Sequence, residues 1–137
     1  MSEHPGQAAH DQETVDLAHA LFDLARQGRT ERLVAYVDAG APVDLADPAG
    51  NTFLMLAAYH GHAALVRELA RRGADVDRLN DRGQSPLAGA VFKGEPEVVS
   101  ALVEHGADPD AGEPTARQTA QMFGRADLLT GQDQPKD

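Results

Sequence analysis

The sequence GHAALVRELARRGAD, residues 61–75, is followed 33 residues later by GEPEVVSALVEHGAD, residues 94–108. In each stretch a glycine stands twelve residues before a second glycine, which opens a Gly-Ala-Asp triplet. Gly28 and Gly40 keep the same spacing in a weaker copy upstream. Self-similarity at a fixed period between about 20 and 50 residues indicates a protein built from stacked repeats. We therefore interpret the chain as a repeat array before assigning a role to any single residue.

The start of each repeat carries a second signal. TFLMLAA, residues 52–58, aligns with SPLAGAV, residues 85–91, at the same offset. The period and this Thr-Pro-Leu-like start resemble the ankyrin repeat over roughly residues 14–129. The resemblance implies an all-α fold, a solenoid of about four stacked helix-turn-helix repeats joined by short hairpin loops. It also implies a role in binding another protein.

We expect one ankyrin repeat domain over residues 13–130, with repeats at about 13–46, 47–79, 80–111 and 112–130. The flanking residues 1–12 and 131–137 are polar and lack apolar periodicity, so both are predicted to be disordered tails. The first helix is expected to begin near Thr14. The first repeat lacks the Thr-Pro-Leu start, and the last has a shortened loop and a truncated second helix. Imperfect, polar end repeats are typical of the caps that a solenoid needs.

Local signals place the ends of several helices. Thr52 and Ser85 are predicted N-caps, because a side-chain hydroxyl there can accept an early backbone N–H. Pro96 suits the first turn of a helix, where its missing N–H has no cost. Gly73 and Gly106 are expected just after helix C-termini, where glycine enters the left-handed region without steric strain.

Composition excludes several classes of function. The chain has 137 residues, no cysteine and a net charge of −10. An acidic surface repels phosphates, so neither nucleic acid nor an anionic membrane is expected as a partner. No signal peptide or membrane-spanning run is visible, and we expect a cytoplasmic monomer. The Ala- and Arg-rich, Lys-poor composition suggests a bacterial source with a GC-rich genome.

Residues with catalytic or metal-binding chemistry have structural interpretations that we prefer. Ser85 occupies a helix-capping position rather than that of a nucleophile. His62 stands at the family's Gly-His position, which the resemblance implies bonds between repeats, and His60 alone adds no third zinc ligand. The pairs Asp75/Asp77 and Asp108/Asp110 recur because turns favour Asp at backbone-bonding positions. We predict no enzymatic activity, no cofactor and no metal.

The resemblance implies a concave binding face made of the hairpin tips and the ends of the first helices. Aromatic residues and arginine anchor many protein interfaces, so the aromatic residues and Arg26 at the helix ends are the best candidates. Alternatively, Tyr59 and Phe92 only pack on the adjacent hairpin. The residues predicted to bind the partner are Arg26, Gln27, Asn51, Tyr59, His60, Asp81, Arg82, Gln84, Phe92, Lys93, Met122 and Phe123.

The expected function is non-catalytic protein recognition, as an adaptor, an inhibitor or a regulatory subunit. A second hypothesis is a small-ligand-binding or enzymatic role in the groove near Tyr59, His60 and Gly89. A third is a stabilising subunit that is always bound to another protein. Gly89 lies inside a predicted helix, where glycine costs about 1 kcal/mol relative to alanine. It either admits close packing of Phe53 or Phe92, or opens a small pocket.

Overall fold

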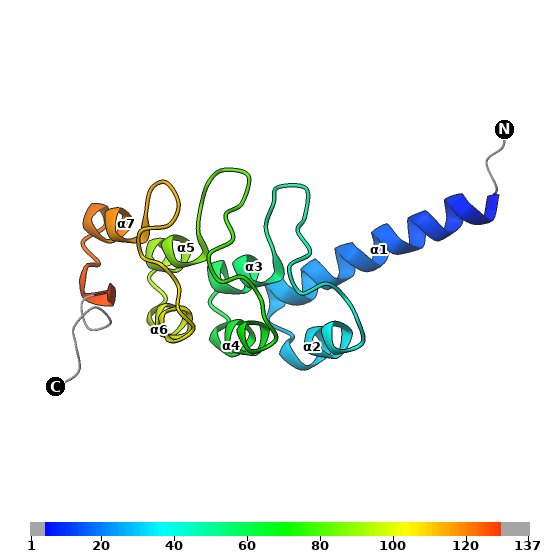
Figure 1. The fold of residues 1–137 in the computed structure, drawn as a ribbon, viewed down its shortest axis with the longest axis horizontal. Coiled ribbons are helices and arrows are strands. Elements are labelled where there is room, and N and C mark those ends of the chain that lie inside the picture. Colours follow the sequence, from blue (N-terminus) through cyan, green and yellow to red (C-terminus); the bar gives the residue numbers. More distant parts are fainter. Residues whose placement is uncertain (1–4, 130–137) are drawn as a thin grey trace.

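The computed structural model describes the backbone of residues 5–129 and the side chains of residues 12–129. Figure 1 shows helices stacked in two rows, with hairpin loops projecting along one edge. The helices are α1 (Pro5–Gln27), α2 (Thr30–Asp38), α3 (Phe53–Tyr59), α4 (Ala63–Arg71), α5 (Pro86–Lys93), α6 (Pro96–Glu104) and α7 (Ala116–Met122). Residues 127–129 begin a further helical turn.

The two rows follow from the alternation of helices along the chain. In the inner row, α1 packs on α3, α3 on α5 and α5 on α7. In the outer row, α2 packs on α4 and α4 on α6. Within the described residues the only extended pairing is an isolated bridge between Ala46 and Thr52, at the base of a hairpin. The expected all-α solenoid is confirmed.

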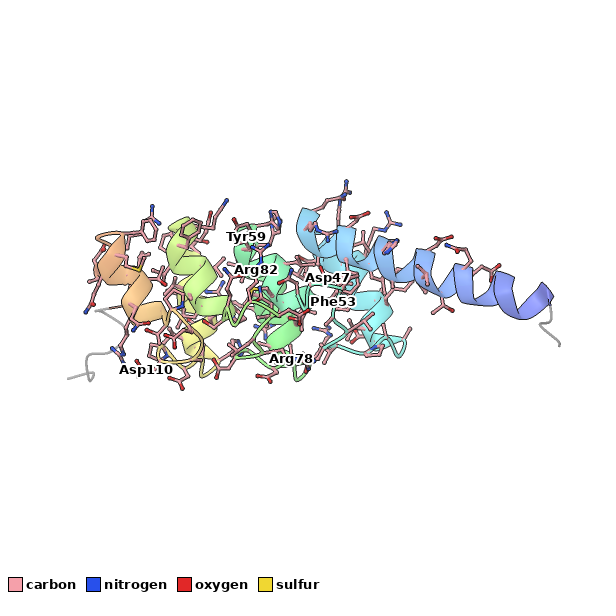
Figure 2. The ribbon with its side chains drawn as sticks, turned by 90° about the horizontal axis from the view of Figure 1, so that it is seen from above. Asp47, Phe53, Tyr59, Arg78, Arg82 and Asp110 are labelled. Carbon is pink, nitrogen blue, oxygen red and sulfur yellow. The ribbon has the colours of Figure 1, made fainter. Side chains whose placement is uncertain are left out.

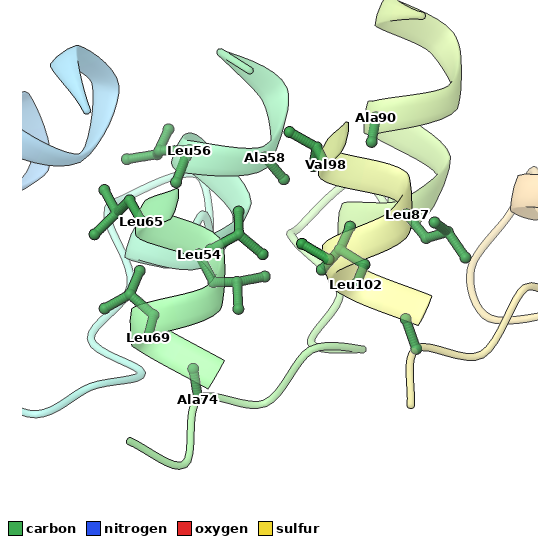
Figure 3. Packing of buried hydrophobic residues seen from close by; sticks show 14 of the residues in the cluster. Leu54, Leu56, Ala58, Leu65, Leu69, Ala74, Leu87, Ala90, Val98 and Leu102 are labelled. Atoms are coloured by element: carbon green, nitrogen blue, oxygen red, sulfur yellow. The ribbon is translucent and has the colours of Figure 1, made fainter. Parts of the chain in front are cut away.

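Small and aliphatic side chains form one continuous core between the rows. Leu54, Leu65 and Leu69 are fully buried in the second repeat, and Leu87 and Leu102 in the third. Figure 3 shows these side chains meeting between the inner and outer helices. Burying one such side chain contributes about 1.5–3 kcal/mol to stability. Because each repeat packs only on its neighbours, the core runs the length of the stack.

The predicted N-caps are confirmed. The hydroxyl oxygen of Thr52 accepts the backbone N–H of Met55 at 3.2 Å, and that of Ser85 accepts the N–H of Ala88 at 3.0 Å. The last repeat is capped in the same way by Thr115, whose hydroxyl accepts the N–H of Gln118 at 3.0 Å. The Gln118 side chain accepts the N–H of Thr115 in return, which completes a capping box.

The turns after the outer helices also form as predicted. Gly73 and Gly106 have φ angles of 93° and 88°, in the left-handed region that glycine enters without strain. The recurring aspartates bond to backbone, both within their turns and between repeats. Asp44 accepts the N–H of Asp75 at 3.0 Å, and Asp77 accepts the N–H of Asp108 at 2.8 Å. Their role is structural, since they join consecutive hairpins.

The N-terminal end differs from the prediction. Residues 5–12, predicted to be a disordered tail, continue α1 as helix from Pro5 onward, and α1 does not begin at Thr14. Proline is compatible with a first helical turn, and Gln7, Ala8 and Ala9 are good helix formers. A helix already anchored at Leu21 and Phe22 extends without a new nucleation cost. Residues 1–4 and the predicted tail at 131–137 lie outside the described residues.

Candidate functional site

Two neighbouring cavities lie where the inner helices meet the hairpins. The first, here the α5–α7 pocket, has a volume of about 290 Å³. Its lining is mainly apolar and comprises Met55, Tyr59, Gln84, Ser85, Ala88, Gly89, Phe92, Pro114, Thr119, Met122 and Phe123. The second, here the hairpin pocket, measures about 310 Å³ and is lined by Ala49, Asn51, Met55, Leu56, Tyr59, Asn80, Arg82 and Gln84. Tyr59 belongs to both cavities and so stands between them.

Aromatic side chains from successive inner helices border the α5–α7 pocket. Tyr59 ends α3, Phe92 lies in the last turn of α5, and Phe123 follows α7. The rings of Phe92 and Phe123 meet edge to face with centroids 5.2 Å apart. Tyr59 is 39% exposed, Phe92 45% and Phe123 46%, while Met122 beside them is 68% exposed. Four of the predicted binding residues therefore share one open apolar surface.

Gly89 faces this surface. A Cβ atom built on Gly89 would lie 3.7 Å from Cδ1 of Tyr59, which is ordinary van der Waals contact. Phe53 packs instead on Phe22, with ring centroids 5.1 Å apart. Of the two roles considered for Gly89, the structure supports the pocket, because Gly89 lines the cavity and close approach of Phe53 does not require a glycine there.

The hairpin tips are held by one residue that the sequence analysis did not single out. The side-chain nitrogen of Asn80 donates to Oδ1 of Asn51 at 3.0 Å and to Oε1 of Gln84 at 2.8 Å. Its oxygen accepts the backbone N–H groups of Arg82 and Gln84. The repeat period could have identified Asn80 in the sequence, because it stands 33 residues after Asp47. The Asp47 side chain accepts backbone N–H groups in the preceding hairpin in the same way.

The cations of the predicted site differ in whether a carboxylate already pairs with them. Arg26 lines neither cavity. Its charge is already paired, with Asp23 at 2.8 Å and with Asp47 at 3.7 Å. Lys93 places its Nζ atom 4.8 Å from the ring centroid of Tyr59. Arg82 lines the hairpin pocket, and Figure 2 shows it beside Tyr59.

Three further predicted residues, Gln27, His60 and Asp81, line neither cavity. Gln27 is exposed at the end of α1, and Asp81 donates its backbone N–H to Ala49 in the neighbouring hairpin at 3.0 Å. His60 lies next to Tyr59, with ring centroids 5.4 Å apart. Burial, followed by the charges of His62, Lys93 and Arg26, holds the pKa of His60 below its ordinary value. His60 is therefore mainly neutral at pH 7.

The candidate catalytic and metal-binding residues of the sequence take structural roles. Nε2 of His62 lies 2.7 Å from the carbonyl oxygen of Arg26, which ties the second repeat to the first as the resemblance implied. The Ser85 hydroxyl is buried and occupied as a helix cap. Over residues 12–129, no group of three or more His, Asp or Glu side chains is placed to hold a metal ion. What the site offers is a preformed apolar surface bordered by two cations.

These features define a class of protein, a helical repeat solenoid with two rows of helices and hairpins projecting along one edge (Figure 1). The family model described as ankyrin repeats (3 copies) matches residues 21–113, more than half of the chain. The chain belongs to the ankyrin repeat family.

Two relatives share part of this region. An ankyrin repeat protein of Pseudomonas aeruginosa is 51% identical over 57 residues, which cover 42% of this chain and 33% of that protein. The human ankyrin repeat domain-containing protein 29 is 46% identical over 54 residues, 39% of this chain and 18% of that protein. The matches therefore span a third or less of each relative. No helix within residues 5–129 is long and apolar enough to cross a membrane.

Proposed function

We propose that the protein is a non-catalytic recognition module that binds a partner protein on its concave face. The observation that carries this proposal is the exposed apolar surface of Tyr59, Phe92, Met122 and Phe123 around the α5–α7 pocket. Ankyrin repeats are generally protein–protein interaction modules, and this chain belongs to that family. Contiguous exposed apolar patches with polar rims are typical of interaction or ligand-binding sites.

The surface has the physical properties of an interface centre. Tyr59 and Phe92 are large and have few rotatable bonds, so little side-chain entropy is lost when a partner covers them. Each could contribute about 2 kcal/mol or more as an anchor. The hydrogen bonds of Asn80 hold the hairpins in place before binding, which reduces the ordering cost of association.

The test is affinity capture from the source organism, followed by comparison of two double variants on the identified partner. We expect Tyr59→Ala with Phe92→Ala to abolish capture. The matched control is Arg71→Ala with Glu104→Ala, which alters the outer helices α4 and α6. Helical circular dichroism should be unchanged in both variants.

Two results would overturn the assignment of this face. The first is loss of the partner by the control variant with retention by the groove variant, which would move binding to the convex side. The second is equal binding by both variants. Because Phe92 also packs on Phe123, thermal melting of the groove variant must accompany the binding measurement.

A small ligand in the α5–α7 pocket is a second candidate function. The specific observation is the glycine in α5, which enlarges an apolar cavity of about 290 Å³ at the cost of helix propensity. A thermal-shift screen against metabolites tests this candidate. A compound that stabilises the wild-type chain but not Gly89→Leu would support it, and a screen without such a compound would count against it.

A further inference from the structure

The size of the α5–α7 pocket limits what can fill it. Cavities for drug-sized ligands usually span about 300–1,000 Å³, so this one of about 290 Å³ lies at the lower bound. One large side chain fits such a space better than a whole cofactor. A segment of a partner protein lying across the concave face would insert a single residue there.

The lining determines the chemistry of that residue. Most of the wall is hydrocarbon, from side chains such as Phe92, Met122 and Pro114. The polar groups of the wall are the hydroxyls of Tyr59, Ser85 and Thr119 and the amide of Gln84. The Gln84 side-chain oxygen accepts from Asn80 at 2.8 Å, and the two aliphatic hydroxyls bond inside their own repeats. Ser85 accepts the N–H of Ala88 at 3.0 Å, and Thr119 donates to the carbonyl of Thr115 at 2.8 Å. A polar side chain in the pocket would give up its hydrogen bonds to water and find few partners in the wall, so the occupant is apolar.

The charges around the pocket point to the residues beside that anchor. The chain carries a net charge of −10, yet the cations next to Tyr59 are Lys93 and Arg82. Most basic residues of the outer helices are paired, such as Arg71 with Glu68 and Arg72 with Asp38. Among the ion pairs of the described residues, none involves Lys93 or Arg82.

The nearby carboxylates do not compensate these two cations. Asp81, next to Arg82, is turned toward the neighbouring hairpin, where its Oδ1 lies 2.5 Å from the position of a Cβ on Gly50. The Glu95 carboxylate is likewise turned toward Gly61. Arg125, the third cation of this region, donates to the carbonyls of Val91 and Phe92 and is engaged within the stack.

We propose that the partner binds through an acidic segment with one bulky apolar side chain. That side chain enters the α5–α7 pocket, and flanking Asp or Glu residues pair with Lys93 and Arg82. The inference rests on the proposed function, since it names the chemistry of the segment that the concave face takes. Complementary charge next to a buried anchor gives both orientation and selectivity.

The probe is a library of random twelve-residue peptides displayed on phage and selected on the immobilised full-length chain. We expect enriched sequences with Leu, Phe or another large apolar residue within three positions of two or more carboxylates. Selection of basic peptides, of peptides without a large apolar residue, or of no peptide at all would overturn the inference.

A synthetic peptide from the selection then tests the pocket. Gly89→Leu places a side chain in the cavity and should weaken binding of the peptide about tenfold or more. The matched control is Ala35→Leu, the same kind of enlargement at an exposed position of α2, which should bind as the wild type does. Unchanged affinity of a folded Gly89→Leu variant would show that no side chain enters the pocket.

The same peptide tests the charges. Arg82→Gln with Lys93→Gln should weaken binding about fivefold or more at low salt and flatten its salt dependence. The control, Arg32→Gln with Arg71→Gln, removes equal charge from the outer helices α2 and α4 and should have a smaller effect. Equal effects of the two double variants would mean that only net charge matters, and would overturn the pairing.

These outcomes separate the inference from the proposed function. Suppose that Tyr59→Ala with Phe92→Ala loses the captured protein, while Gly89→Leu and the charge variant keep it. The concave face then binds the partner, but the inferred chemistry of the partner segment, acidic with one apolar anchor, is wrong. If the groove variant keeps the captured protein, the proposed function fails on its own test.

Discussion

Gly73 and Gly106 show how a single residue sets the end of each outer helix. Their φ angles of 93° and 88° lie where a Cβ is strained, although open space surrounds both positions. We expect Gly73→Ala and Gly106→Ala each to lower the free energy of unfolding by about 1 kcal/mol or more. Urea denaturation midpoints measure the change. Midpoints equal to that of the wild type would contradict the repeat register described here.

Gly89 should respond in the opposite direction. It lies inside α5, and a Cβ there would make only an ordinary contact with Tyr59 at 3.7 Å. Alanine removes the helix-propensity penalty of glycine, so Gly89→Ala should raise the free energy of unfolding by about 0.5–1 kcal/mol. Urea denaturation of the purified variant is the measurement. A destabilised variant would contradict the conclusion that the site accepts a Cβ without strain.

The partial burial of Asp77 makes stability depend on pH at one residue. Burial, with the charges of Asp108 and Asp75, raises the pKa of Asp77 above its ordinary 3.8, although the N–H of Asp108 opposes this shift. The folded state therefore holds the Asp77 proton more tightly than the unfolded state does. It loses stability as pH rises from 3.8 through the raised pKa, and the full penalty remains at pH 7.

Asp77→Asn isolates this effect, because the amide oxygen can still accept the N–H of Asp108 without a charge. We expect this variant to be at least as stable as the wild type at pH 7, with any advantage shrinking below about pH 4. Melting temperatures at pH 3.5 and pH 7 measure the difference. Glu13→Gln, at an exposed position of α1, is the control for net charge. A loss of stability at pH 7 confined to Asp77→Asn would contradict this account.

At the scale of elements, position in the stack sets how firmly each helix is held. The second-repeat helix α3 lies between α1 and α5, whereas α7 packs on α5 at the end of the inner row. The stability of a solenoid repeat includes the free energy of its interfaces with adjacent repeats, so a repeat with one neighbour lacks one of these contributions. The position of each repeat in the stack therefore predicts which repeats unfold locally first.

The last repeat should open first. Hydrogen exchange should show weaker protection for residues 115–129 than for residues 54–70, because the final repeat has one neighbour and a short second helix. Mass spectrometry of exchanged peptides resolves the two segments. Equal protection would indicate that the end of the stack is covered, for instance by a second copy of the chain.

The candidate binding face also depends on elements rather than on isolated residues. Sequence spacing correctly places Tyr59, Phe92 and Met122 at equivalent ends of α3, α5 and α7. It cannot show that Arg26, their counterpart on α1, also pairs with Asp47 of the following hairpin. It also cannot show that Asn80 bonds to Asn51 across two hairpins. Both contacts join side chains whose approach depends on how neighbouring repeats are stacked.

At the scale of the whole molecule, the stack converts a repeated sequence into a surface with distinct sides. The outer helices carry paired charges, such as Arg67 with Glu104, while Lys93 and Arg82 border the pockets of the concave face. α1 extends beyond the repeats at one end of the stack (Figure 1). The proposed recognition of an acidic segment depends on this separation of charge, which no single repeat has.

The sequence by itself determined the repeat period, the all-α fold, the caps at Thr52 and Ser85 and the turns at Gly73 and Gly106. These features depend on local backbone preferences, which are set by the type of a residue and of its near neighbours in the chain. Tertiary structure decided that Gly89 faces Tyr59 and opens a pocket, and that α1 continues to Pro5. The first depends on the packing of side chains from different repeats. The second depends on a helix that packing at Leu21 and Phe22 has already nucleated and that local helix formers then extend. Only the first has no local signal in the sequence.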